Sequence, residues 1–199
     1  MLMVIQEIRF WPWAMVFFLG AVVSLTFTGL WGGPFLMHAY GLSKTQAGSI
    51  LSMMALGLMF GSPTMSWLAD HVFRSRKKLL ATNQFIALCL FALLAFFTAH
   101  FNKPLLYIWC FAYSFSISGA VVVGYSSIKE YFPLEIAGTA MGIINIFPFA
   151  GAALGQPLMG LYLDRFGAAG GSYSMAAYSS VFKIGVLFLL GAFIASLLV

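Results

Sequence analysis

Six long stretches of apolar residues, separated by short polar connections, form the pattern of this 199-residue chain. They cover about residues 11–40, 44–69, 78–99, 104–128, 137–163 and 177–199. Roughly 20 helical residues cross the hydrocarbon layer of a bilayer, and barrel strands are much shorter than these stretches. A helix also satisfies its own backbone hydrogen bonds within the membrane. The pattern therefore predicts an all-α integral membrane protein with six transmembrane helices in a single domain, residues 1–199.

Two of these stretches, 44–69 and 137–163, follow nearly the same plan. Eight identities recur 94 positions apart: Thr45, Gly48, Ile50, Gly57, Gly61, Pro63, Met65 and Asp70 match Thr139, Gly142, Ile144, Gly151, Gly155, Pro157, Met159 and Asp164. Several are Gly, Pro or Asp, which are costly inside a membrane helix, so shared apolar composition does not account for them. Spans three apart cross the bilayer in opposite directions. We therefore expect two inverted three-helix repeats, about 11–99 and 104–199, a plan that recurs in secondary transporters.

The amino-acid composition agrees with a membrane location and makes several classes of function unexpected. The chain is 62% hydrophobic and 8% charged, with a mean hydropathy of +0.97, and a soluble core of this size could not bury that much apolar surface. The net charge of +5 is interpreted as loop charge, and nucleic acid is not an expected partner. Cys89 and Cys110 have no metal-ligand spacing, so no metal, cofactor or disulfide is expected. Paired acids or a serine with a base do not occur within the spans, so an enzyme is not expected either.

The basic residues predict the orientation. With the N terminus inside, the inner side holds Arg9, Arg74, Arg76, Lys77, Lys78 and Lys129, and the outer side holds Lys44, Lys103, Arg165 and Lys183. Lys and Arg concentrate in cytoplasmic loops. We therefore expect both termini in the cytoplasm and the protein in the bacterial inner membrane, with the lipid bilayer as its surroundings.

Two local signals concern the ends of the first and second stretches. Ser43 followed by Gln46 has the order of a capping box and predicts a helix start. Gly32, Gly33 and Pro34 lie near the outer end of the overlong first stretch, where proline removes a hydrogen-bond donor. A break there fits a gate or binding element, and a plain helix end before a loop fits equally well.

The loop after the second stretch combines one acid with a basic run. Asp70 is followed by Arg74, Arg76 and Lys77. Its carboxylate can accept hydrogen bonds from an arginine or from the free amides of a neighbouring helix start. These four residues are therefore predicted to form a conformational latch, which favours one state of the protein and is released in another.

This loop resembles the signature of the major facilitator superfamily, a Gly, then Leu-x-Asp, then a basic run. In this chain the matching residues are Gly61 and Leu68-Ala69-Asp70. His71 stands where the family usually has Arg or Lys, which implies a looser latch. Residues 131–145 resemble the start of the eleventh span of that family, and residues 29–36 resemble its seventh span. The resemblance implies that this sequence is the second six-span half, spans 7 to 12, and that a first half is its partner.

Glycine spacing predicts where helices approach closely. The pairs are Gly57/Gly61, Gly138/Gly142 and Gly151/Gly155, each four residues apart. Gly151 lies about half a turn from Gly142, so the 137–163 stretch has two such faces, one for use within the chain and one for a partner. In the resembled family the second and fifth spans of each half meet the other half. The tight faces of both copies are accordingly expected to point toward a half that this sequence lacks.

Several polar or aromatic residues fall within the spans and are candidates for a solute pathway. They are Trp31, Tyr113, Tyr125, Asn145 and Gln156. Asn145 is the sharpest candidate because a primary amide in lipid needs partners. Contact with solute and hydrogen bonding between helices both fit it, and Trp31 fits either a cavity wall or an ordinary packed aromatic. The Ser and Thr residues are expected to bond to a carbonyl one turn back.

Together these observations predict half of an alternating-access secondary transporter for a small solute. It is expected to need a partner half or a second copy of itself. No charged side chain lies at the centre of a span, which favours a neutral or amphipathic solute. The alternative is a truncated, non-transporting membrane protein that acts as a structural or interaction module.

Overall fold

Six long helical segments dominate the computed structural model, which describes residues 2–167 and 171–199. The helices are α1 (Leu2–Gln6), α2 (Phe10–Thr26), η1 (Phe27–Trp31), α3 (Gly32–Tyr40), α4 (Lys44–Leu68), η2 (Ala69–Phe73), α5 (Arg76–Phe97), η3 (Thr98–His100), α6 (Lys103–Tyr131), α7 (Leu134–Asp164) and α8 (Met175–Leu198). Six continuous segments are long and apolar enough to span a membrane: Phe10–Tyr40, Lys44–Phe73, Arg76–His100, Lys103–Tyr131, Leu134–Asp164 and Met175–Leu198. The predicted all-α membrane fold is confirmed, with every boundary within four residues.

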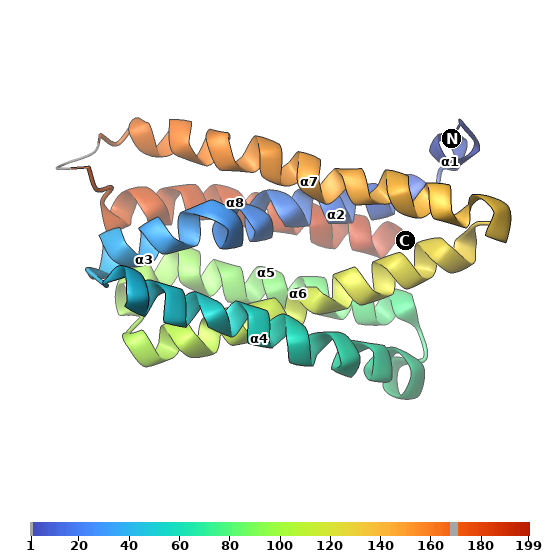
Figure 1. Ribbon diagram of the computed structural model, residues 1–199, viewed down its shortest axis with the longest axis horizontal. Helices are drawn as coiled ribbons and strands as arrows, with labels where there is room; N and C mark the ends of the chain where they lie inside the picture. Colours follow the sequence, from blue (N-terminus) through green and yellow to red (C-terminus); the bar gives the residue numbers. More distant parts are fainter. Residues whose placement is uncertain (1, 168–170) are drawn as a thin grey trace.

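Short connections and side-chain caps define the helix ends. The predicted capping box is present, with the Gln46 amide donating to Ser43 Oγ at 3.3 Å and the Ser43 amide donating to Gln46 Oε1 at 3.2 Å. Asn102 and Ser174 cap α6 and α8 in the same manner as Ser43 caps α4, by accepting from a backbone amide. The segments alternate in direction, so both termini lie at one end of the molecule, on the right in Figure 1. We call this the terminal end, and the opposite end the distal end.

The first span contains a distortion that the sequence located only approximately. The helix does not end at Pro34 but continues to Tyr40, where Gly41 takes a left-handed conformation with φ 63°. The irregular part is the π-helical turn η1, in which the Gly32 amide bonds to the Phe27 carbonyl five residues back. The interpretation of Gly32–Pro34 as a plain helix end before a loop is therefore wrong. The wide turn precedes Pro34 because proline cannot donate to Leu30 and its ring crowds that carbonyl.

The contacts between helices follow the same pattern in the two halves of the chain. If each of the first three spans is replaced by the span three positions later, and the reverse, the same helix pairs are in contact. α4 crosses α6 and α7 crosses α2, whereas α5 and α8 pack against each other and against α6 and α2. α4 and α7 lie nearest the viewer in Figure 1, and α5 and α8 lie farthest away. Each tight crossing therefore joins one helix of residues 11–99 to one of residues 104–199. This contact pattern is compatible with an inverted repeat, which stays a prediction.

Two of the glycine pairs make these crossings possible. A Cβ on Gly57 would lie 2.5 Å from the Phe111 carbonyl, and a Cβ on Gly151 would lie 2.5 Å from the Phe18 carbonyl. Gly61 and Gly155, one turn further along, approach the backbones of α6 and α2 in the same manner. The expectation that these tight pairs face a missing half is wrong. They are used within the chain because each repeat packs its second helix on the first helix of the other.

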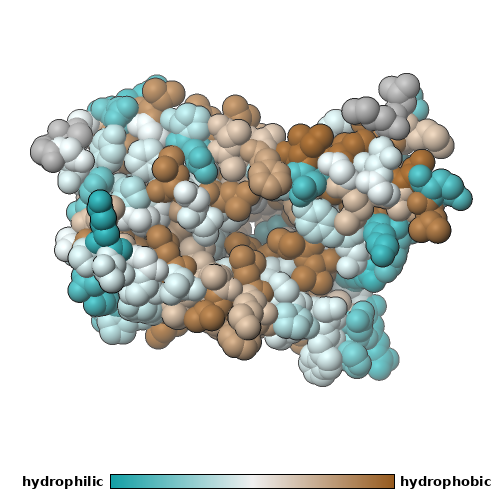
Figure 2. All heavy atoms as spheres, in the orientation of Figure 1, coloured by the Kyte–Doolittle hydropathy of each residue, from teal (hydrophilic) through white to brown (hydrophobic). Residues whose placement is uncertain are grey.

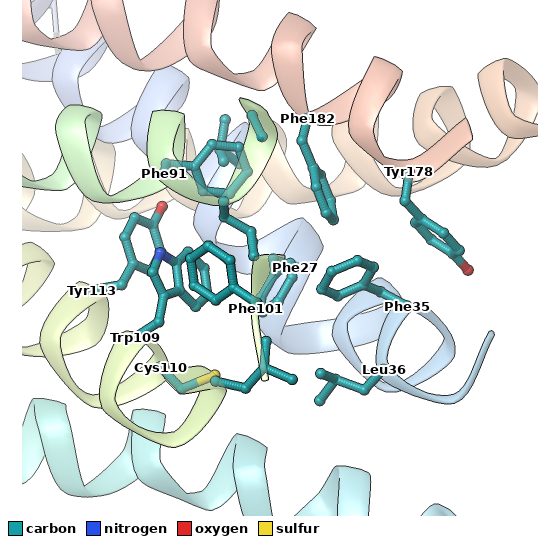
Figure 3. Close-up of a cluster of buried hydrophobic side chains, with 14 of the residues drawn as sticks. Phe27, Phe35, Leu36, Phe91, Phe101, Trp109, Cys110, Tyr113, Tyr178 and Phe182 are labelled. Carbon is teal, nitrogen blue, oxygen red and sulfur yellow. The ribbon is translucent and has the colours of Figure 1, made fainter. Parts of the chain in front are cut away.

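Buried apolar side chains form two clusters, one toward each end. The distal cluster includes Phe27, Phe35, Phe91, Trp109 and Phe182, whose rings meet at the centre of Figure 3. The terminal cluster lies around Phe10, Trp13, Phe17, Leu79 and Leu80. Hydrophilic residues gather at the two ends of the molecule in Figure 2, and apolar residues cover much of the surface between them. This distribution suits a protein surrounded by lipid.

Candidate solute-facing surface

A stripe of exposed residues runs along the face of α7 that is turned away from α2. It includes Gly138, Gly142, Asn145 and Phe149, and the half-buried Gln156 continues it. Asn145 and Gln156 are about 20° apart around the helix axis and about 16 Å apart along it. A Cβ on Gly138 or Gly142 would meet no atom within 4 Å. The third predicted glycine pair therefore has no partner helix among the described residues.

The stripe belongs to a broader face formed by α2, α4, α6 and α7. Figure 2 shows this face from the front, and the surface is hollowed near its middle. A shallow pocket on α7, lined by Gly142, Asn145, Ile146, Phe149, Ala150 and Ala153, lies on it. The face also exposes large apolar side chains: Ile146 is 60% and Phe149 is 65% exposed. It is suited to contact with another surface rather than with water.

Tyr125 and Asn145 form the polar pair nearer the terminal end. The Tyr125 hydroxyl on α6 donates to Asn145 Oδ1 on α7 at 2.5 Å. The amide group of Asn145 has no hydrogen-bond acceptor among the described residues and stays exposed. Both interpretations of Asn145 thus have a physical basis, since its oxygen joins two helices and its two N–H donors are free for a solute.

Trp31 and Gln156 form a second pair, nearer the distal end. Trp31 Nε1 donates to the backbone carbonyl of Gln156 at 2.9 Å, which ties the first span to α7. The tryptophan ring also lies beside Gly160, where a Cβ would be 3.1 Å from Cζ2. Trp31 is the last residue of the π-helical turn, and such a turn shifts the residues that follow it around the helix. The distortion therefore helps to place Trp31 against α7.

Tyr113 is not part of this face. It is fully buried in the distal cluster, stacked on Trp109 with ring centroids 5.0 Å apart and packed against Phe91 (Figure 3). Its hydroxyl has no hydrogen-bond partner among the described residues. The structure therefore brings four of the five pathway candidates to one face, in two pairs, and keeps Tyr113 apart.

The predicted latch residues do not form one cluster. Arg76, at the start of α5, binds both carboxylate oxygens of Glu130 at 2.5 and 2.6 Å. Asp70 lies exposed in η2 and makes no ion pair among the residues that the structure describes. Arg74 takes a left-handed conformation with φ 47°, which turns the chain between α4 and α5. Because Arg76 begins the helix after this turn, it faces the last turn of α6 instead of Asp70.

Asp164, the repeat counterpart of Asp70, has a partner that sequence reasoning missed. The Tyr173 hydroxyl donates to Asp164 Oδ1 at 2.5 Å, and this hydrogen bond raises the pKa of Tyr173 above its ordinary value. Close by, the His38 ring nitrogen Nδ1 and the Tyr178 hydroxyl are 2.9 Å apart, and the Tyr173 ring lies beside both. These four residues, the distal polar cluster, link the ends of the first, fifth and sixth spans. The recurrence of Asp at the end of the second span of each predicted repeat was the one signal that could have indicated it.

The two residue pairs on the solute-facing surface, Tyr125 with Asn145 and Trp31 with Gln156, offer uncharged hydrogen-bonding groups. No group of three or more His, Cys, Asp or Glu residues suited to a metal occurs in the described ranges.

Comparison with protein families shows that the family model described as Major Facilitator Superfamily matches residues 12–199. The comparison with curated proteins gives no match.

Proposed function

We propose that this chain, which belongs to the Major Facilitator Superfamily, forms one half of an alternating-access carrier for a small solute. The family consists of transporters, and six membrane-spanning helices with an unpartnered face fit that activity. The observation that carries the proposal is the arrangement of Asn145, Tyr125, Trp31 and Gln156 in two pairs on that face. A second half placed against it would enclose these groups near the bilayer midplane.

The exposed glycines on α7 support the need for a partner. Gly138 and Gly142 leave room for a helix backbone to approach closely, and the neighbouring Ile146 and Phe149 provide apolar area to bury. The partner is a first six-span half or a second copy of this chain. Closing such a face would also shield the hydrogen-bonding pairs from lipid.

The groups on the face favour a neutral or amphipathic solute. The donors and acceptors on the face are the Asn145 amide, the Tyr125 hydroxyl and the Gln156 side chain, and none of the described residues that line the shallow pocket on α7 is ionised. Both termini are proposed to be cytoplasmic, in the bacterial inner membrane, because the basic loop at 74–78 lies at the terminal end.

The direct test is uptake of labelled sugars, amino acids and nucleosides by cells that express the chain alone or together with a first six-span half. For a solute that is taken up, Asn145→Ala is expected to lower uptake about tenfold, the effect of losing one hydrogen bond to the solute. Tyr125→Phe should lower uptake less than Asn145→Ala. Tyr162→Phe is its control, because Tyr162 lies about 100° around α7 from Asn145. Absence of uptake for every solute in both preparations would contradict the transport proposal.

The free α7 face can be tested separately in a chain whose native Cys89 and Cys110 are replaced by alanine. Gly142→Cys should be protected from a lipid-soluble maleimide when the partner half is present, whereas Leu190→Cys on α8 should react in both cases. Equal labelling at the two positions under all conditions would instead favour the non-transporting interaction module.

A further inference from the structure

A second cavity lies on the opposite side of α7 from the solute-facing stripe. It has a volume of about 330 Å³ and is enclosed by α2, α5, α7 and α8. Leu158 contributes to its wall and lies about 180° around α7 from Phe149. The two sites therefore share a helix but face different surroundings. A volume of this size is at the lower end of the range of small-molecule sites.

The opening of this cavity is lateral, toward lipid. Its most exposed apolar wall residues are Leu158 and Leu161, which are 56% and 65% exposed and lie within the membrane-spanning part of α7. The inner wall consists of buried aromatic side chains, including Phe27, Phe91 and Phe182, which belong to the distal cluster in Figure 3. A hydrocarbon chain can enter from the bilayer without crossing water.

Among the described residues, one charged side chain lines the cavity. Arg165 follows the last residue of α7, at the distal end of the span, where lipid headgroups lie. Its guanidinium makes no hydrogen bond or ion pair among the described residues and is free to bind an anion. Thr26 also lines the cavity, and its buried hydroxyl has no acceptor in the part of the chain that the structure describes. The site thus combines an apolar interior, a hydroxyl donor and a positive charge at the headgroup level.

We propose that this cavity binds one acyl chain of an anionic phospholipid, with the lipid phosphate held by Arg165. The positive charge of Arg165 favours an anionic headgroup, and the apolar cavity accommodates the acyl chain. The site should therefore prefer an anionic lipid to a zwitterionic one with the same chains. A tightly held lipid would fasten α7 to α8, which otherwise touch each other far less than each touches α2. The proposal does not depend on transport activity.

Native mass spectrometry of the purified full chain, titrated with phosphatidylglycerol, phosphatidylcholine and oleate, tests it. One phosphatidylglycerol molecule should be retained at about tenfold lower lipid concentration than phosphatidylcholine with the same chains, as expected for one charge-assisted contact. Ile184→Trp, which fills the cavity, should weaken binding of both lipids about tenfold or more, whereas Ile194→Trp on the lipid-facing side of α8 should leave it unchanged. Arg165→Gln should abolish the preference for the anionic lipid, and Lys44→Gln should preserve it.

A second measurement does not rely on the fold of any variant. Phosphatidylglycerol with a photoreactive group in its acyl chain should crosslink mainly to residues 155–165 and 181–188 of the unmodified protein. Equal binding by Ile184→Trp and Ile194→Trp, equal affinity for the two phospholipids, a preference for oleate over phosphatidylglycerol, or crosslinks spread evenly over α5 would each overturn the proposal.

Discussion

The two tight helix crossings, α4 on α6 and α7 on α2, have the same backbone design but differ in the hydroxyl group at each crossing. Gly61 lies against Ser118 Oγ, which donates to the Phe115 carbonyl at 2.7 Å. Gly155 lies against Thr26 Oγ1, which has no acceptor among the described residues. The comparison shows that the glycines allow the same close backbone approach at both crossings, whereas the hydrogen bonding of the side chains around them differs.

The ends of the same helices also differ. Asp70 after α4 is exposed and unpaired within the described ranges, and the ion pair at that end joins Arg76 to Glu130. Asp164 at the end of α7 binds Tyr173, within the distal polar cluster. The two aspartates that correspond in the predicted repeat therefore have different surroundings, because the neighbouring loops differ in length and charge.

The largest expected effect comes from filling a crossing. Gly57→Leu or Gly151→Leu should lower the free energy of unfolding by about 3 kcal/mol or more, because even a Cβ would lie 2.5 Å from a backbone carbonyl. Gly142→Leu, on the exposed stripe of α7, should change the free energy of unfolding by no more than about 0.5 kcal/mol. Thermal unfolding of the three variants in detergent measures the difference, and a similar loss for Gly142→Leu would contradict the assignment of the faces.

Removal of the hydroxyl group at each crossing should affect stability differently. Ser118→Ala removes a made hydrogen bond and should cost about 1 kcal/mol of unfolding free energy, whereas Thr26→Val removes an unsatisfied hydroxyl and should cost nothing or stabilise slightly. The pair is compared by unfolding in a denaturing detergent. A larger loss for Thr26→Val would mean that its hydroxyl has an acceptor in the membrane.

The ion pair at the terminal end should contribute little. Arg76 and Glu130 have side chains that are 34% and 64% exposed, so water and salt screen their attraction. Glu130→Gln should lower the free energy of unfolding by no more than about 1 kcal/mol, and the difference should shrink at high salt. Asp70→Asn, measured alongside, should change stability less than Glu130→Gln.

The smallest effect concerns the distal end and depends on pH. The Asp164 carboxylate raises the pKa of Tyr173, so the folded state holds the tyrosine proton more tightly than the unfolded state. This contribution is complete below the ordinary tyrosine pKa of about 10 and is lost as the pH rises through the raised value. The unmodified protein should therefore lose more thermal stability than Tyr173→Phe as the pH rises above about 10. Parallel curves for the two proteins would show that this hydrogen bond is not coupled to folding.

Much of the candidate face was accessible from sequence because helical spacing is regular. The stripe through Gly142, Asn145, Phe149 and Gln156 follows from about 100° per residue, and the structure places these residues along one side of α7. Trp31 and Tyr113 were not distinguishable in this way, since both are aromatic residues within a span. Trp31 binds α7 because of the π-helical turn, and Tyr113 is buried in the distal cluster because of how α6 packs. Only the tertiary structure distinguishes the two.

The sequence by itself determined the six spans, the helix caps and the positions where backbones can approach closely. These are local properties, fixed by apolar length, by residues three or four positions apart and by the absence of a side chain at glycine. The tertiary structure alone decided which helix each glycine pair contacts, that Arg76 binds Glu130 54 residues away, and that Asp164 meets Tyr173 beyond the end of α7. Such contacts depend on where a helix ends and turns and on which neighbour it then faces, because a pairing across space leaves no periodic signal in one chain.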